Sequence, residues 1–70
     1  MKRITVESSN LHSVGYDSDT QTLEIEFRNS GIYQYYGVPE TVYRQLMAAT
    51  SHGKFFYAHI RDVYRYGKIK

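Results

Sequence analysis

The amino-acid sequence predicts a small α+β domain in which a three-stranded antiparallel meander is covered on one face by two C-terminal helices. Residues 11–36 hold three short β-type segments separated by turn residues, and residues 39–63 repeat apolar side chains at helical spacing. A chain this short has room for one hydrophobic core. We therefore expect a single domain over residues 1–70, with its core at about 11–68. Residues 1–10 are expected to form an arm or a short extra strand.

The middle strand, Thr22 to Phe27, is the clearest element because its apolar and charged residues alternate strictly. The apolar residues share one face and the charged residues share the other: Leu23, Ile25 and Phe27 against Glu24, Glu26 and Arg28. Such a strand belongs to a sheet with one face in solvent. Further strands are predicted at His12 to Asp17 and at Ile32 to Tyr36, with turns at residues 18–21 and 29–31.

The first helix is predicted to begin at Pro39 and to run to about Ala49. Proline has a fixed φ that suits the first helical turn, where its missing N–H costs no hydrogen bond. Val42, Leu46 and Ala49 lie at i, i+4 and i+7 and form an apolar stripe. This stripe supplies the layer that the apolar face of the sheet requires.

A second helix is predicted after an interruption at residues 50–53. Phe56, Ile60 and Val63 again lie at i, i+4 and i+7, so this helix is expected to pack on the same face of the sheet. Its end is ambiguous, because residues 63–66 are compatible with a helix and with an extended segment.

The amino-acid composition indicates how the core is stabilised and where the protein is expected to be located. The chain has no cysteine, so neither a disulfide nor a thiolate zinc site supports its core. Its eight tyrosines and three phenylalanines must supply much of the buried area. Glu7 interrupts the N-terminal segment before an apolar run develops, and no later stretch approaches the ~18 residues of a membrane span. We expect an unsecreted cytoplasmic monomer that contacts no membrane.

Charge is distributed unevenly along the chain. Residues 1–42 carry three Lys or Arg and six Asp or Glu, a net charge of −3, whereas residues 43–70 carry six and one, a net charge of +5. A clustered positive field attracts polyanions such as nucleic acids. The same asymmetry also arises when acidic strands lie beside basic helices within one domain.

The sequence contains no strong catalytic signature. It lacks a cysteine nucleophile, Gly-x-Ser-x-Gly, His-Glu-x-x-His, a phosphate loop and a Gly-rich dinucleotide turn. Glu24 and Glu26 are two apart on a strand, so they are expected to share a solvated face rather than flank a pocket. His12, His52 and His59 are spread over three elements with no other ligand at metal-binding spacing. We expect no enzymatic activity, no metal site and no cofactor.

Two alternating sets of residues on the third strand have different predicted roles. Tyr33 and Tyr35 share one face, as do the paired aromatic residues that stack bases on RNA-binding sheets. Core packing is favoured over base stacking, because register with the middle strand puts both rings under the helices. Ile32, Gln34 and Tyr36 would then form a small exposed patch.

A stripe that combines basic and aromatic residues is predicted on the outer face of the second helix. Its members are Lys54, Tyr57, Ala58, Arg61, Tyr64, Arg65 and Lys68. Cations contact phosphates and flat rings stack on bases, so the stripe offers both requirements of RNA binding on one surface. The alternative is an ordinary solvated helix face, and the stripe itself requires the helix to continue past Asp62.

The chain also resembles the KTSC domain family, named for its occurrence at the C-terminus of some lysyl-tRNA synthetases. The resemblance covers residues 8 to about 68. The segments that carry it are Val14-Gly15-Tyr16-Asp17, Leu23-Glu24-Ile25-Glu26-Phe27, Tyr33-Gln34-Tyr35, Val38-Pro39, Ser51-His52-Gly53-Lys54-Phe55-Phe56 and Ile60-Arg61. The family has no established activity, and its connection with a tRNA-charging enzyme implies RNA binding. The family-motif residues with an expected structural role are Tyr33, Tyr35, Pro39, Gly53 and Ile60.

Two functions follow as hypotheses. The first is a non-catalytic domain that binds RNA or is associated with tRNA, in which Tyr57 or Tyr64 stacks on a base. Its phosphate contacts are assigned to Lys54, Arg61, Arg65 and Lys68. The alternative is a protein-interaction module that uses the exposed patch of the third strand or an unpaired sheet edge.

Overall fold

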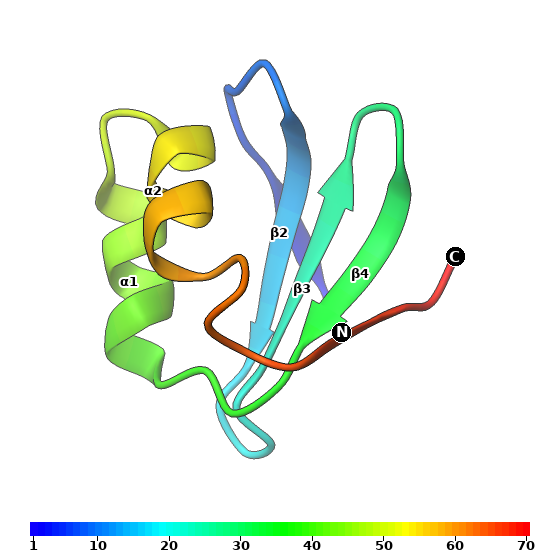
Figure 1. Cartoon of the computed structure of the whole chain (residues 1–70), viewed down its shortest axis with the longest axis vertical. Helices are drawn as coiled ribbons and strands as arrows, with labels where there is room; N and C mark the ends of the chain where they lie inside the picture. The colour runs from blue at the N-terminus through cyan, green and yellow to red at the C-terminus, as the bar shows by residue number, and fades with distance from the viewer.

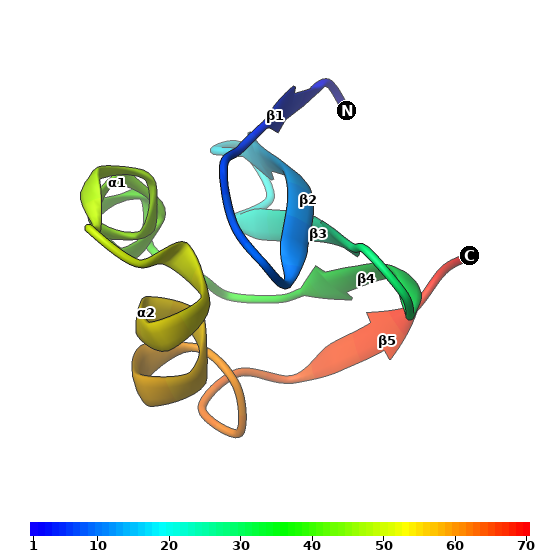
Figure 2. The ribbon, with the colours of Figure 1, turned by 90° about the horizontal axis from the view of Figure 1, so that it is seen from above.

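Five antiparallel strands lie side by side in chain order, and two helices cover one face of this sheet (Figures 1 and 2). The computed structural model describes all of residues 1–70. The elements are β1 Arg3–Thr5, β2 Leu11–Asp17, β3 Thr22–Phe27, β4 Gly31–Tyr35, α1 Glu40–Ala48, α2 His52–His59 and β5 Tyr66–Lys68. Neither helix has the length and apolar character needed to cross a membrane.

The α+β class and the central meander are confirmed, but the prediction of three strands is incomplete. β2 and β4 each begin one residue earlier than expected, and β4 ends at Tyr35 rather than Tyr36. The arm at residues 1–10 contains β1, which pairs with β2. The ambiguous C-terminal tail contains β5, which pairs with β4. The sequence allows a short strand in residues 1–10 and an extended tail, but both elements are three-residue edge strands, too short for alternation to decide between the alternatives.

The core lies between the helices and one face of the sheet. In the β3–β4 register, Leu23 pairs with Tyr35 and Ile25 with Tyr33, so all four side chains point to the same face. Leu46, Phe56 and Ile60 cover that face from the helical layer and are themselves buried. The prediction that Tyr33 and Tyr35 point to the helical side of the sheet is therefore confirmed. Tyr35 is buried, whereas Tyr33 remains half-buried.

The first helix agrees closely with its prediction. Pro39 is the residue before the helix, with φ −63° and ψ 150°, and α1 ends at Ala48 instead of Ala49. Val38, next to it, is fully buried and its carbonyl accepts a hydrogen bond from the Tyr16 hydroxyl. The ring of Tyr16 also stacks on Tyr43 of α1, with centroids 4.8 Å apart. These contacts attach the start of α1 to the sheet.

The second helix stops earlier than its apolar spacing predicts. The backbone N–H groups of Ile60 and Arg61 both donate to the carbonyl of Phe56, at 3.0 and 2.9 Å, which closes the helix. Asp62 then adopts a left-handed φ of 64° and turns the chain away from the helix axis. Val63, predicted to continue the apolar stripe, is instead 61% exposed. Ile60 keeps its predicted core position.

The opposite face of the sheet is not the uniformly solvated surface that the alternation predicts. Glu24 is only 5% exposed, since Arg3 of β1 crosses over Gly15 and forms an ion pair with its carboxylate. Gln34 donates to the same carboxylate at 2.9 Å. The expectation that Glu24 lies on a solvated face is therefore wrong. The sequence does not show that β1 places Arg3 over this face of the sheet.

The buried carboxylate should make stability depend on pH. Burial raises the pKa of Glu24, but the hydrogen bonds from Gln34 and Arg3 and the charge of Arg3 oppose this and leave the pKa below its usual value of 4.5. A carboxyl with a lowered pKa in the folded state stabilises the fold above 4.5. This contribution is lost as pH falls through the folded-state pKa.

Urea unfolding of the wild type and of Glu24→Gln between pH 6 and pH 2 tests this effect. We expect the wild type to be the more stable near pH 6, with the difference between the two free energies of unfolding shrinking below about pH 4.5. A difference that stays constant over this range would show that Glu24 does not contribute through its charge.

Candidate nucleic-acid interface

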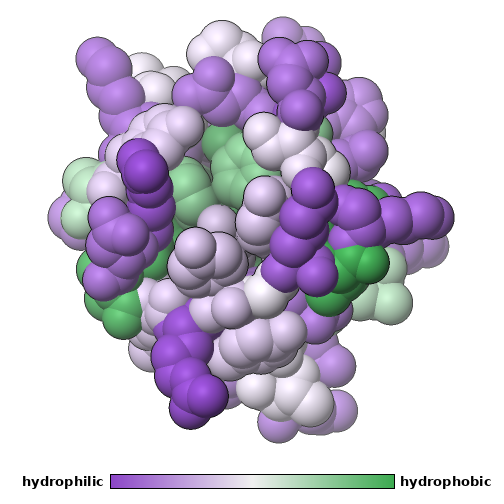
Figure 3. Space-filling view, turned by 45° about the vertical axis from the view of Figure 1, so that its right-hand side comes forward, coloured by the Kyte–Doolittle hydropathy of each residue, from purple (hydrophilic) through white to green (hydrophobic).

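A cleft opens between α2 and the β3–β4–β5 part of the sheet. Its volume is about 330 Å³, at the lower end of the range for pockets that hold small ligands. The residues that line it are Phe27, Ser30, Tyr33, Tyr35, Phe56, Tyr57, Arg61, Asp62 and Tyr66. Figure 3 shows a hydrophobic hollow in the upper centre of this face, bordered by hydrophilic residues. The cleft thus combines an apolar interior with a polar rim.

Five aromatic side chains form a closed ring of contacts in this cleft, the five-ring cluster. The centroid distances are 5.2 Å for Phe27–Phe56, 5.3 Å for Phe56–Tyr35, 5.5 Å for Tyr35–Tyr66, 6.1 Å for Tyr66–Tyr33 and 5.6 Å for Tyr33–Phe27. All lie within the separation at which aromatic pairs attract one another. The walls of the cleft therefore consist largely of flat aromatic rings.

The sheet register brings these rings together. Tyr33 and Tyr35 alternate with Gln34 and so point to the helical side, while Tyr66 of β5 lies directly opposite Tyr35. Phe56 extends from α2 across the gap to reach Phe27 and Tyr35. The cleft therefore depends on three strands and one helix that are distant in the sequence.

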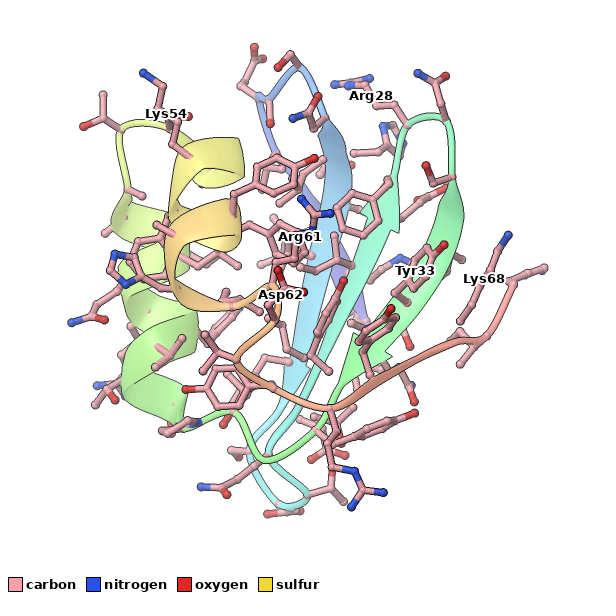
Figure 4. All side chains as sticks on the ribbon, viewed as in Figure 1. Arg28, Tyr33, Lys54, Arg61, Asp62 and Lys68 are labelled. Carbon is pink, nitrogen blue, oxygen red and sulfur yellow. The ribbon has the colours of Figure 1, made fainter.

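Two cations lie over rings of the cleft. The guanidinium carbon of Arg61 is 5.2 Å from the centroid of the Tyr57 ring, and Nζ of Lys68 is 6.0 Å from that of Tyr33. Arg61 and Asp62 lie in the space between α2 and the sheet, and Lys68 lies across from them on β5 (Figure 4). Both cations are on exposed residues, so a bound anion could reach them.

Two polar groups of the cleft have no partner within the protein. The hydroxyl of Tyr35 makes no intramolecular hydrogen bond, although the residue is only 5% exposed. Burial, followed by the neighbouring Tyr66 and Tyr33, raises the pKa of Tyr35 to about 12, so this hydroxyl keeps its proton at physiological pH. The carboxylate of Asp62 makes neither a hydrogen bond nor an ion pair.

The predicted basic and aromatic stripe does not exist as one helical face, because α2 ends at His59. Tyr57 and Arg61 lie in the cleft, and Lys68 reaches it from β5. Lys54 lies at the other end of α2, away from Asp62 (Figure 4). The remaining three members lie outside the cleft: Ala58 is exposed on α2, Tyr64 is half-buried against the core and Arg65 is exposed in the segment before β5.

Several residues of the cleft were not predicted from the sequence. Phe27 and Phe56 were expected only in the core, and Tyr66 and Asp62 were assigned no role. A usable signal was present at Asp62, since an Asp shortly after an apolar helical repeat can adopt the left-handed conformation that ends a helix. No group of three or more His, Asp or Glu side chains is placed to hold a metal ion.

The glycine and proline positions of the predicted structural motif have identifiable packing roles. Gly53 is buried in the first turn of α2, whose preceding residue, Ser51, accepts a hydrogen bond from the Lys54 N–H at 3.2 Å. Pro39 immediately precedes α1, which begins one residue later than predicted. These residues position the helices and do not line the cleft.

Comparison with known proteins identifies relatives over almost the entire chain. The family model described as the KTSC domain matches residues 7–64. The crystal structure of a KTSC domain protein from Yersinia pestis is 45% identical, with a TM-score of 0.97, and the match covers 99% of this chain and 97% of that one. An uncharacterized protein of Stutzerimonas stutzeri is 41% identical over 99% of both chains.

A lysine–tRNA ligase of Trichormus variabilis is 36% identical over 63 residues, which are 90% of this chain but only 11% of the ligase. The relation to the ligase is therefore confined to one small segment of that enzyme. The family match over residues 7–64 and the agreement with the Yersinia structure over the whole fold lead to the same assignment. The chain belongs to the KTSC domain family.

Proposed function

We propose that this domain binds single-stranded RNA through the aromatic cleft, without catalysing a reaction. The observation that carries the proposal is the five-ring cluster with Arg61 and Lys68 over rings at its rim. Proteins that bind single strands stack bases on aromatic side chains and use cations to contact the backbone. Both requirements are met within one cleft, which replaces the helical stripe as the binding surface.

The relation to lysine–tRNA ligases supports RNA over other polyanions. Three lysine–tRNA ligases, from Trichormus variabilis and two Nostoc strains, contain a segment 33–36% identical to 90% of this chain. A domain joined to an enzyme named for tRNA is well placed to contact that RNA. Because the segment is 11% of each ligase, the aminoacylation activity itself is not transferred to this chain.

The salt dependence of RNA binding tests the role of the two cations. If Arg61 and Lys68 each neutralise one phosphate, log affinity should fall with log salt at a slope near −1.4. A fourfold rise in salt then weakens binding about 7-fold. Fluorescence anisotropy with a labelled single-stranded RNA of about eight nucleotides measures the slope.

Variants separate the cleft cations from general basic charge. The double variant Arg61→Ala/Lys68→Ala should bring the slope close to zero, whereas Lys54→Ala removes one charge away from the cleft and should leave it unchanged. NMR shifts of the labelled protein should concentrate on the cleft residues. Equal losses from Lys54→Ala and from the cleft variants would contradict a defined binding site.

The protein-interaction alternative has weaker support in the fold. Gln34, at the centre of the proposed patch, is half-buried and donates to Glu24 at 2.9 Å, so its amide is already engaged. The outer edge of β4 is covered by β5. Tyr36 alone is well exposed, at 42%. Under this alternative Tyr36→Ala would abolish partner binding, whereas the RNA proposal expects Tyr36→Ala to bind RNA normally.

A further inference from the structure

Asp62 occupies a backbone conformation that other residue types adopt more readily. Its φ of 64° lies in the left-handed region, where glycine is favoured and Asn and Asp are tolerated. A glycine here would end α2 with less strain, so helix termination does not explain the carboxylate. The side chain lines the cleft and has no partner in the protein. The cleft therefore contains a free carboxylate beside aromatic walls.

A second unpartnered group lies deeper in the same cleft. Tyr35 as a whole is only 5% exposed, but its hydroxyl oxygen is not enclosed and makes no hydrogen bond within the protein. A phenolic O–H is both a donor and an acceptor. Because this hydroxyl lines the cleft and has no partner in the protein, it is free to form a hydrogen bond with a ligand.

The polar groups of the cleft match the edge of one nucleobase. Guanine is the only common base with two neighbouring N–H donors, N1–H and N2–H, on its Watson–Crick edge, and a carboxylate offers two acceptors. Adenine and cytosine each place an acceptor next to their amino group. This acceptor would face the second carboxylate oxygen, and the two would repel each other. Uracil has a single N–H between two carbonyls. Guanine also has the acceptors O6 and N7, to which a hydroxyl or an N–H group can donate.

We propose, on the basis of the RNA-binding function above, that the cleft holds one unpaired guanine of the RNA strand. The base stacks against the aromatic walls, the Asp62 carboxylate accepts hydrogen bonds from N1–H and N2–H, and the Tyr35 hydroxyl donates to an acceptor on the base. Arg61 and Lys68 contact the flanking phosphates, as in the proposed function. The cleft volume of about 330 Å³ fits a ligand at the small end of those held by protein pockets.

Four oligonucleotides that differ in one central base test the proposal: UUGUU, UUAUU, UUCUU and UUUUU. A good bidentate contact discriminates between bases by about 5- to 150-fold. We expect the full chain to bind UUGUU tighter than the other three by a factor in this range, measured by isothermal titration calorimetry. Equal affinity for all four would overturn the guanine assignment and leave RNA binding intact, whereas no binding of any would overturn the proposed function as well.

Asp62→Asn is the decisive variant. Asparagine tolerates the left-handed conformation and has nearly the same size, so the fold is expected to persist. Its amide presents a donor beside an acceptor, which suits adenine better than guanine. The preference for UUGUU over UUAUU should therefore fall at least 5-fold, with binding of UUUUU unchanged or tighter. An unchanged guanine preference in Asp62→Asn would overturn the proposal.

Guanosine monophosphate distinguishes a base within RNA from a free nucleotide. It should bind at least 10-fold more weakly than UUGUU, because it has one phosphate for the two cations, Arg61 and Lys68, and lacks the neighbouring nucleotides of the strand. Equal affinity for the mononucleotide and UUGUU, together with no binding of UUUUU, would mean that the cleft is a nucleotide site and would overturn its assignment to RNA.

Discussion

Phe56→Ala should lower the free energy of unfolding by about 3–5 kcal/mol, the usual cost of removing a buried aromatic side chain. The side chain is 2% exposed and contacts three other rings: Phe27 at 5.2 Å, Tyr35 at 5.3 Å and Tyr57 at 5.3 Å between centroids. It is the one ring that connects α2 to the aromatic side of the sheet. Truncation leaves a cavity and removes contacts from both layers.

The size of this effect is large relative to the whole domain. Folded domains are stable by roughly 0.05–0.15 kcal/mol per residue, or about 3.5–10 kcal/mol for a chain of this length. Phe56→Ala should therefore be largely unfolded at 37 °C or have a much reduced urea midpoint. Circular dichroism during urea unfolding measures the change.

The neighbouring residue offers a matched control for Phe56→Ala. Tyr57 belongs to the same helix and is 49% exposed, so Tyr57→Ala should lower the free energy of unfolding by less than about 1 kcal/mol. It should nevertheless weaken RNA binding, because it removes an aromatic wall of the cleft. Similar losses of stability in the two variants would show that the five-ring cluster does not hold α2 on the sheet.

Gly15→Ala should destabilise the domain by about 1–3 kcal/mol, the usual cost of overpacking. A Cβ at this position would lie 2.7 Å from the carbonyl oxygen of Lys2 and 3.0 Å from Cγ of Arg3. The first of these atoms belongs to the backbone leading into β1, so relief requires β1 to move. Displacing β1 also separates Arg3 from Glu24 and leaves a buried carboxylate without its ion pair.

Substitution of a second buried glycine, Gly53, by alanine should stabilise the domain instead of destabilising it. At Gly53 a Cβ would meet only the side chain of Asn10 at 3.4 Å and that of Ser8 at 3.9 Å. Because Gly53 lies in the first turn of α2, Gly53→Ala should raise the free energy of unfolding by up to about 0.5–1 kcal/mol. Thermal unfolding of both variants tests the pair. Stability equal to wild type in Gly15→Ala would mean that β1 contributes little to the fold.

Local patterns were sufficient for the elements that carry their own periodicity. The strict alternation of β3 and the apolar spacing of α1 reflect which face of each element is buried, so both appear directly in the order of residues. The same logic led to the correct face for Tyr33 and Tyr35. Pro39 and the resemblance to the KTSC family also follow from short segments of the chain.

The end of the second helix could not be derived from apolar spacing. Val63 continues the apolar pattern, but the backbone has already left the helical conformation at Asp62. One left-handed residue converts the predicted helix tail into β5, and the reversal depends on pairing with β4 that lies more than 30 residues away in the sequence. The same reversal brings Tyr66 and Lys68 to the cleft. Helical spacing therefore grouped residues that the fold separates.

The order of residues alone established the fold class, the central meander, the first helix and the family. Only the packed chain decided that Glu24 is buried, that β1 and β5 extend the sheet and that five aromatic rings meet in one cleft. The physical reason is the range of the interactions involved. Periodicity arises from neighbours within a few positions, whereas the cleft and the Arg3–Glu24 pair join side chains from distant segments, whose proximity depends on how the whole chain packs.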